Sequence, residues 1–229
     1  MTTKIDGELM DRAIDNAARV RHITSPNPWV GATLATVDGS IFDGATSPPG
    51  GPHAEISAME QAGPGAAGAT LYTTLEPCVH HGRTPPCTDA IIAAGVRRVV
   101  VGVTDPDPDV AGGGVAALQE GGVEVDVGVR AQAVSEQLRP YLHHRITGRP
   151  FVVLKLALSL DGRIAAPDGS SKWITGPAAR RFAHRLRAES DAVIVGAGTV
   201  RADDPELTVR DWAPSEGVFG NDLDPRRYV

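Results

Sequence analysis

Residues 53–87 read HAEISAMEQAGPGAAGATLYTTLEPCVHHGRTPPC and contain both cysteines of the chain, Cys78 and Cys87. Upstream of them lie His53 and, two positions later, Glu55. One imidazole and two thiolates are a ligand set that zinc commonly takes in proteins. A structural zinc site normally has four protein ligands, whereas a catalytic site keeps one position for water. A set of three therefore predicts a catalytic zinc site.

Glu55 is too close in sequence to His53 to be needed as a ligand. It is well placed to move a proton between water and substrate, as a carboxylate does in zinc deaminases. On a helix, side chains two positions apart diverge by about 200°. The two residues can thus share a cavity only where a helix begins, and apolar residues at Ile56, Met59 and Ala62 fit a helix that continues from there.

Each cysteine follows a proline, Pro77 before Cys78 and Pro86 before Cys87. Proline is frequent at the first position of a helix, where free N–H groups and the macrodipole favour thiolates. The sequence therefore predicts that each cysteine opens a helix. The alternatives are two inert buried thiols and a noncatalytic zinc-stabilised binding module, for which Glu55 has no use.

The spacing of the cysteines is distinctive. The usual nucleoside deaminase signature is Pro-Cys-x-x-Cys, whereas eight residues separate Cys78 from Cys87. Together with TSPNPWVG at residues 24–31, the motifs resemble the bifunctional riboflavin biosynthesis deaminase/reductase family over nearly the whole chain. The resemblance implies an α/β fold, namely a cytidine deaminase-like three-layer domain followed by the amino-terminal part of a dihydrofolate reductase-like domain.

The resemblance also implies a reaction, the hydrolytic deamination of 2,5-diamino-6-(5-phosphoribosylamino)pyrimidin-4-one. Zinc on His53, Cys78 and Cys87 would activate water, and Glu55 would pass the proton to the departing amine. The resemblance places Asn27, His80 and Arg83 at the substrate, although an Asn before a proline is also typical of a turn. Another purine or pyrimidine base deaminase is the alternative, which the long loop between the cysteines disfavours.

Composition limits the remaining classes. With 229 residues, 41% of them hydrophobic, the chain can form a sizeable core in one or two domains. No apolar run is long enough to cross a membrane, no secretory signal is visible, and two cysteines give no disulfide framework. We expect a cytosolic protein without a membrane partner. A net charge of −6 disfavours a nucleic-acid partner, and a homo-oligomer is compatible with the sequence.

Hydrophobic periodicity predicts a layered α/β domain over residues 1–147. The expected helices are 7–21, 88–94, 115–120 and a basic linking helix in 134–149; the expected strands are 30–37, 41–42, 70–74, 97–103 and 123–127, with a hairpin turn at Asp38-Gly39. Gly112, Gly113 and Gly114 predict a flexible loop, because they lack the Lys-Ser/Thr of a phosphate loop.

Residues 148–229 are similar to the opening of the family's reductase domain, which uses NADPH. We expect strands at 151–158, 159–165 and 191–195, a helix at 177–189, and disorder from residue 210. An intrastrand lysine, Lys155, suggests a ligand phosphate or carboxylate, because burying it unpaired is costly. The resemblance assigns Ala157, Trp173, Thr199 and Asp203 to NADPH, and Lys155, Ser171, Arg187, Leu207 and Arg210 to the substrate. It also implies that the reductase half is truncated at Val229 and does not complete its NADPH cleft.

Overall fold

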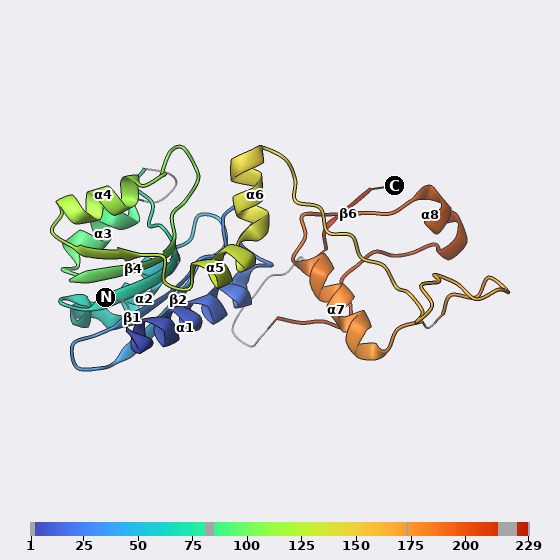
Figure 1. Ribbon diagram of the computed structural model, residues 1–229, viewed down its shortest axis with the longest axis horizontal. Helices are drawn as coiled ribbons and strands as arrows, with labels where there is room; N and C mark the ends of the chain where they lie inside the picture. The colour runs from blue at the N-terminus through green and yellow to red at the C-terminus, as the bar shows by residue number, and fades with distance from the viewer. Residues whose placement is uncertain (1–2, 81–84, 173, 215–223, 229) are drawn as a thin grey trace. The chain divides into compact units, whose positions relative to one another are not determined.

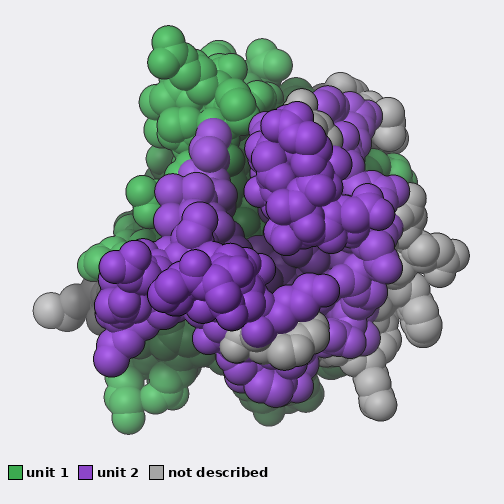
Figure 2. Space-filling model, turned by 90° about the vertical axis from the view of Figure 1, so that its right-hand side faces the viewer, with its two compact units in different colours: residues 1–151 green, residues 152–229 purple. Residues whose placement is uncertain are grey.

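The computed structural model describes residues 3–80, 85–172, 174–214 and 224–228 (Figure 1). The chain divides into two compact units, Met1–Phe151 and Val152–Val229, which Figure 2 shows in different colours. Within the described ranges, every helix is too short or too polar to cross a membrane.

The first unit is organised on a five-stranded sheet with the order β2-β1-β3-β4-β5. Its strands are β1 Gly31–Ala35, β2 Ile41–Ala45, β3 Thr70–Leu75, β4 Arg98–Val103 and β5 Glu124–Val127. The predicted hairpin is confirmed, since β1 pairs antiparallel with β2 across a turn in which Gly39 has a φ of 87°. Strands β3, β4 and β5 are parallel, and consecutive residues Val99, Val100 and Val101 of β4 are fully buried, as expected of a strand covered on both faces.

Helices cover the two faces of this sheet and make the predicted three layers (Figure 1). Helices α1 (Lys4–Val20) and α5 (Ala131–Gln137) pack together on one face, and α2 (Ala54–Ala62), α3 (Cys87–Ala93) and α4 (Gly113–Glu120) form the other layer. Helix α2 approaches β2 very closely at Gly44. A Cβ at this position would lie only 2.0 Å from the carbonyl oxygen of Ala54, so only glycine fits there. That contact holds the beginning of α2, and with it His53, at the carboxyl ends of the parallel strands.

A buried ion pair links α1 to the amino-terminal end of β4. Asp6 of α1 is 1% exposed and accepts hydrogen bonds from Arg98 Nη1 (2.7 Å) and Tyr72 OH (2.9 Å). The Arg98 guanidinium holds the pKa of Asp6 well below its usual value, although burial opposes the shift. This carboxylate lies at the opposite end of the strands from His53.

The second unit has less regular structure than the sequence predicts. It contains α7 (Pro177–Ala188), α8 (Ala197–Asp203) and a two-stranded parallel sheet of β6 (Ala192–Ile194) and β7 (Arg226–Tyr228). Strand β7 falls in a segment for which disorder was predicted. The strand predicted at 151–158 and the one at 159–165 do not form.

The physical reason is the lack of a partner. A strand needs a neighbour for its backbone N–H and C=O groups, and within the described ranges no segment pairs with 151–165. Val152, Leu154 and Leu156 are exposed as a result, and so is Lys155. Lys155 is therefore not buried in a strand, and the ligand predicted from its burial is not required by this structure.

Candidate metal centre

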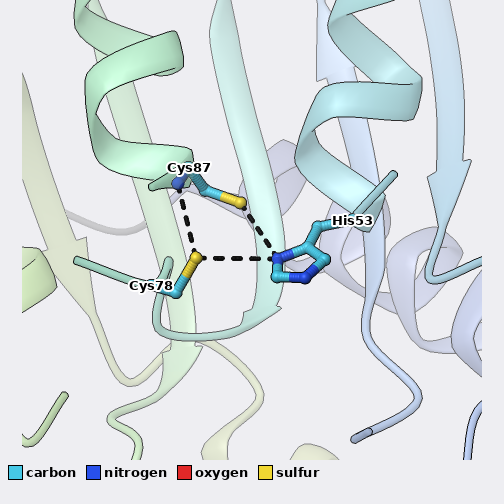
Figure 3. Close-up of side chains that lie close together, drawn as sticks. All are labelled: His53, Cys78 and Cys87. Carbon is cyan, nitrogen blue, oxygen red and sulfur yellow. Dashed lines mark hydrogen bonds between the residues drawn. The ribbon is translucent and has the colours of Figure 1, made fainter. Parts of the chain in front are cut away.

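Three side chains from distant parts of the first unit converge at the carboxyl ends of the parallel strands (Figure 3). His53 is the N-cap of α2, Cys78 lies in the loop after β3, and Cys87 is the first residue of α3. His53 Nδ1 lies 3.2 Å from Cys87 Sγ and 3.6 Å from Cys78 Sγ, and the possible ligand atoms are all within 4.8 Å of one another. The structure thus brings together the three ligands that the sequence nominates.

The local structure at the cysteines differs from the prediction. Cys87 does open a helix, but residues 76–79 are not helical, so the predicted helix start at Cys78 is wrong. Instead, the backbone N–H of Cys87 donates to Cys78 Sγ at 3.4 Å. The first turn of α3 therefore offers a free N–H to the other cysteine, which favours a thiolate there without a second helix.

The surroundings favour a thiolate at Cys78 and a protonated thiol at Cys87. Hydrogen bonds from Cys87 and His53 lower the pKa of the Cys78 thiol, whereas the hydrogen bond to Cys78 and burial raise the pKa of Cys87. A cation bound by both sulfurs would allow both cysteines to be thiolates, because metal-ligating cysteines are deprotonated. Two sulfurs and one imidazole nitrogen suit zinc, whereas magnesium and calcium prefer oxygen ligands. The residues present therefore fit zinc.

Glu55 lies beside this cluster in the first turn of α2. It is 3% exposed, and Cys87 Sγ donates to its Oε2 at 3.8 Å. Burial raises the pKa of Glu55 to about 7. A carboxyl group with such a pKa can both take up and release a proton near neutral pH, which is the requirement for general acid–base catalysis.

A cavity of about 350 Å³ opens onto the cluster, and its lining comes entirely from the first unit. Its size is in the range of small-molecule sites. Asn27 and His80 line it together with His53, Glu55 and Cys78, so the structure places both predicted substrate residues at the cavity. Arg83, the third, lies outside the described residues.

Sequence reasoning missed part of the cavity wall. Tyr141 and Arg145, on α6 (Arg139–Thr147), line it, whereas the sequence predicts for this segment only a linking helix that ends a domain. Tyr141 OH donates to Asp105 at 2.8 Å, and Arg145 pairs with Asp107 at 3.1 Å. The sequence does contain one indication of this wall, namely the two aspartates just after β4. Ligand sites in α/β sheets lie beyond the carboxyl ends of the strands.

In the second unit, some of the predicted substrate residues lie close together. Arg187 Nη1 donates to the carbonyl oxygen of Thr208 (3.2 Å), and the backbone N–H of Arg210 donates to His184 Nδ1 (3.0 Å). Burial and, to a lesser extent, the nearby charge of Arg210 lower the pKa of Arg187. Leu207, also predicted, is buried with a φ of 57°. His184, which joins these segments, was not predicted.

The other predicted residues of this unit are not gathered in this way. Lys155, Ser171, Thr199 and Asp203 are exposed, and Ala157 is half-buried. Among the residues that the structure describes, no hydrogen bond or ion pair joins any of these to another. Trp173 lies outside the described residues.

Two known families match the chain. Residues 3–103 match the cytidine and deoxycytidylate deaminase zinc-binding region, and residues 150–229 match the RibD C-terminal domain. The first match includes His53, Cys78 and Cys87.

Curated relatives share both parts. The riboflavin biosynthesis protein RibD of Aquifex aeolicus is 48% identical over 216 residues, which are 94% of this chain and 60% of that protein. The RibD protein of Escherichia coli is 48% identical over 208 residues, 91% of this chain and 56% of that protein. The chain therefore spans somewhat more than half the length of these relatives.

Solved structures agree with this similarity. An Acinetobacter baumannii RibD structure has a TM-score of 0.87 at 45% identity, covering 98% of this chain and 62% of that one. A Thermotoga maritima protein described as a diaminohydroxyphosphoribosylaminopyrimidine deaminase/5-amino-6-(5-phosphoribosylamino)uracil reductase has a TM-score of 0.85 at 40% identity, covering 97% and 62%.

Proposed function

Because the chain belongs to the family of RibD riboflavin biosynthesis proteins, we propose that residues 1–147 carry out zinc-dependent hydrolytic deamination of 2,5-diamino-6-(5-phosphoribosylamino)pyrimidin-4-one. The observation that carries the proposal is that His53 and Cys78 of the His/Cys/Cys cluster and the buried carboxyl group of Glu55 line one cavity of about 350 Å³. The substrate is that of the deaminase activity in the name of the Thermotoga maritima relative.

The residues have separate roles in this proposal. His53, Cys78 and Cys87 would hold zinc, which when bound lowers the pKa of a water molecule toward neutrality. Glu55 would accept a proton at a carboxylate oxygen and would donate it to the amino group that leaves the ring. Its burial and its pKa of about 7 suit both halves of this transfer.

The cavity wall supports binding of a polar ring with a phosphoribosyl group. Asn27 offers an amide that can both donate to and accept from ring substituents, and His80 lies at the same cavity. Arg145 brings a positive charge to the wall, where its side chain is 38% exposed and partly balanced by Asp107. By family resemblance, Arg83 belongs with these substrate contacts.

The direct test is ammonia release from the phosphoribosylated diaminopyrimidine by the purified, zinc-loaded chain. We expect turnover with this substrate and little with cytidine, dCMP or guanine at the same concentration. Faster release from one of those three would favour the alternative of a purine or pyrimidine base deaminase. Tight zinc without ammonia release from any of them would favour a zinc-stabilised binding module.

We further propose that the 229-residue chain does not reduce the deaminated product, although the second half belongs to the reductase part of the family. Hydride transfer requires the cofactor and substrate to be held together in one geometry. Arg187, Leu207 and Arg210 would contact the substrate, with Lys155 and Ser171; Ala157, Trp173, Thr199 and Asp203 would contact NADPH. Exposure of Thr199 and Asp203, and of the apolar segment 152–156, supports an incomplete cofactor cleft.

We expect NADPH oxidation by this chain, supplied with the deaminated ribosylaminopyrimidine, to be undetectable under conditions in which the full-length Thermotoga maritima relative, whose name includes the reductase activity, turns over. Absorbance of the reduced nicotinamide follows the reaction. The full-length relative serves as the positive control for substrate and cofactor. Turnover comparable to that control would show that the second unit contains a complete site.

A further inference from the structure

The three consecutive glycines at residues 112–114 do not form a free loop. Gly112 is the N-cap of α4, and Gly113 and Gly114 are its first two residues and pack against the segment that carries Cys78. A Cβ on Gly114 would lie 2.1 Å from the carbonyl oxygen of Pro77, and one on Gly113 would lie 3.2 Å from Val79 Cγ1. Because Pro77 and Val79 flank Cys78, the start of α4 is in contact with both sides of this cysteine.

One buried carboxylate joins the same two segments. Glu76 is 4% exposed, and its Oε2 accepts from the backbone N–H groups of Asp105 (3.1 Å) and Gly112 (3.1 Å). Its Oε1 accepts from the backbone N–H of Val115 at 3.0 Å. The Glu76 side chain therefore links the end of β3 by hydrogen bonds to both ends of the loop between β4 and α4.

Both ends of this link reach the cavity. Glu76 lies two residues before Cys78, and the connection that it holds includes Asp105, Asp107 and Val110 of the cavity wall. A carboxylate only accepts, and hydrogen bonds from backbone N–H groups to an ionised acceptor are among the stronger ones. An amide at the same place would point an NH₂ group at one of these donors.

We propose that Glu76 is a positioning residue, which sets the place of Cys78 and the cavity wall at Asp105 relative to each other. This inference rests on the proposed deaminase function for its effect on catalysis, but its effect on metal affinity is independent of the substrate. Residues that support metal ligands from behind typically contribute 10–100-fold to metal affinity or activity.

The test is Glu76→Gln in the full chain, with two measurements. Competition with a chelator gives the zinc dissociation constant, and ammonia release from zinc-saturated protein gives kcat/KM. We expect zinc affinity and kcat/KM each to fall by about 10-fold or more. If the wild type releases no ammonia, the proposed function fails, while the ratio of the two zinc dissociation constants still decides this inference.

Asp6→Asn is the matched control. Asp6 is an equally buried carboxylate with several donors, but it lies at the opposite end of the strands. We expect this variant to lower the melting temperature and to leave zinc affinity and kcat/KM unchanged. If Glu76→Gln behaves in the same way, Glu76 stabilises the fold only and the inference is overturned.

Should Glu76→Gln not fold, Glu76→Asp replaces it. Aspartate keeps both acceptor oxygens but is one methylene shorter, so it cannot reach all three N–H groups in the same geometry. Zinc affinity below that of Asp6→Asn supports the positioning role. Zinc affinity equal to that of Asp6→Asn overturns it.

Discussion

Glu55→Gln is expected to lower the rate of ammonia release by about 10²–10⁴-fold, the contribution typical of a positioned general acid–base group. The amide has nearly the same shape as the carboxyl group but cannot hold or release the proton. Glu55 is 3% exposed, so solvent water has little access to take over this transfer at the same place. The measurement is kcat for zinc-replete protein with the phosphoribosylated diaminopyrimidine.

The control for this variant lies on the same helix. Glu60 of α2 is exposed, and Glu60→Gln makes the same chemical change away from the cavity. We expect it to retain wild-type kcat. Zinc content and the melting temperature must be checked in both variants, because a loss of metal would mimic the loss of a proton carrier. Near-normal turnover of zinc-replete Glu55→Gln would contradict the assigned role and favour the binding-module alternative.

Side chains of the candidate metal centre could be nominated from the sequence because local geometry constrains them. His53 and Glu55 are two positions apart, and a helix N-terminus is the place where such a pair can share a cavity. The structure shows this arrangement, with His53 as N-cap and Glu55 in the first turn. The same local reasoning failed at Cys78, because a proline before a cysteine also suits the extended chain that follows a strand.

The cavity wall could not be predicted because its contacts are long-range. Tyr141 and Asp105 are 36 residues apart, and Glu76 and Val115 are 39 apart. No periodicity in the sequence connects such pairs; only the parallel order of β3, β4 and β5 brings the loops after them to one edge. The flexible loop predicted at residues 112–114 is wrong for the same reason, since the close contact of Gly114 with Pro77 depends on that order.

The second unit shows the limit of strand prediction. Residues 151–158 have the apolar composition of a strand, yet they remain unpaired within the part of the chain that the structure describes. An apolar composition makes a segment compatible with a buried strand. The segment becomes a strand only where a neighbouring strand pairs with it. Helix α7 was predicted nearly to its ends, because its hydrogen bonds are internal to the segment.

Cys87→Ser is expected to release zinc and to abolish deamination. Cys87 is 1% exposed at the start of α3, so its thiolate is costly to bury unless a cation pairs with it. A serine hydroxyl is a harder and more weakly acidic donor than a thiol and does not replace the soft ligand. Since supporting residues alone contribute about 10–100-fold, loss of a ligand should weaken zinc binding by more than about 100-fold. Elemental analysis after dialysis and chelator competition measure this loss.

Wild-type protein stripped with a chelator is the control for the Cys87→Ser experiment, because both cysteines of the chain belong to the cluster and neither can serve as a neutral reference. Stripped wild type should be inactive and should recover on addition of one equivalent of zinc, whereas the variant should not recover at the same concentration. The backbone N–H of Cys87 that contacts Cys78 Sγ is unaffected by the substitution, so α3 and the Cys78 loop keep that link. A failure to bind zinc therefore reports the missing sulfur. Full and tight zinc occupancy in Cys87→Ser would exclude Cys87 as a ligand and leave His53 and Cys78 without the third protein donor that the mechanism requires.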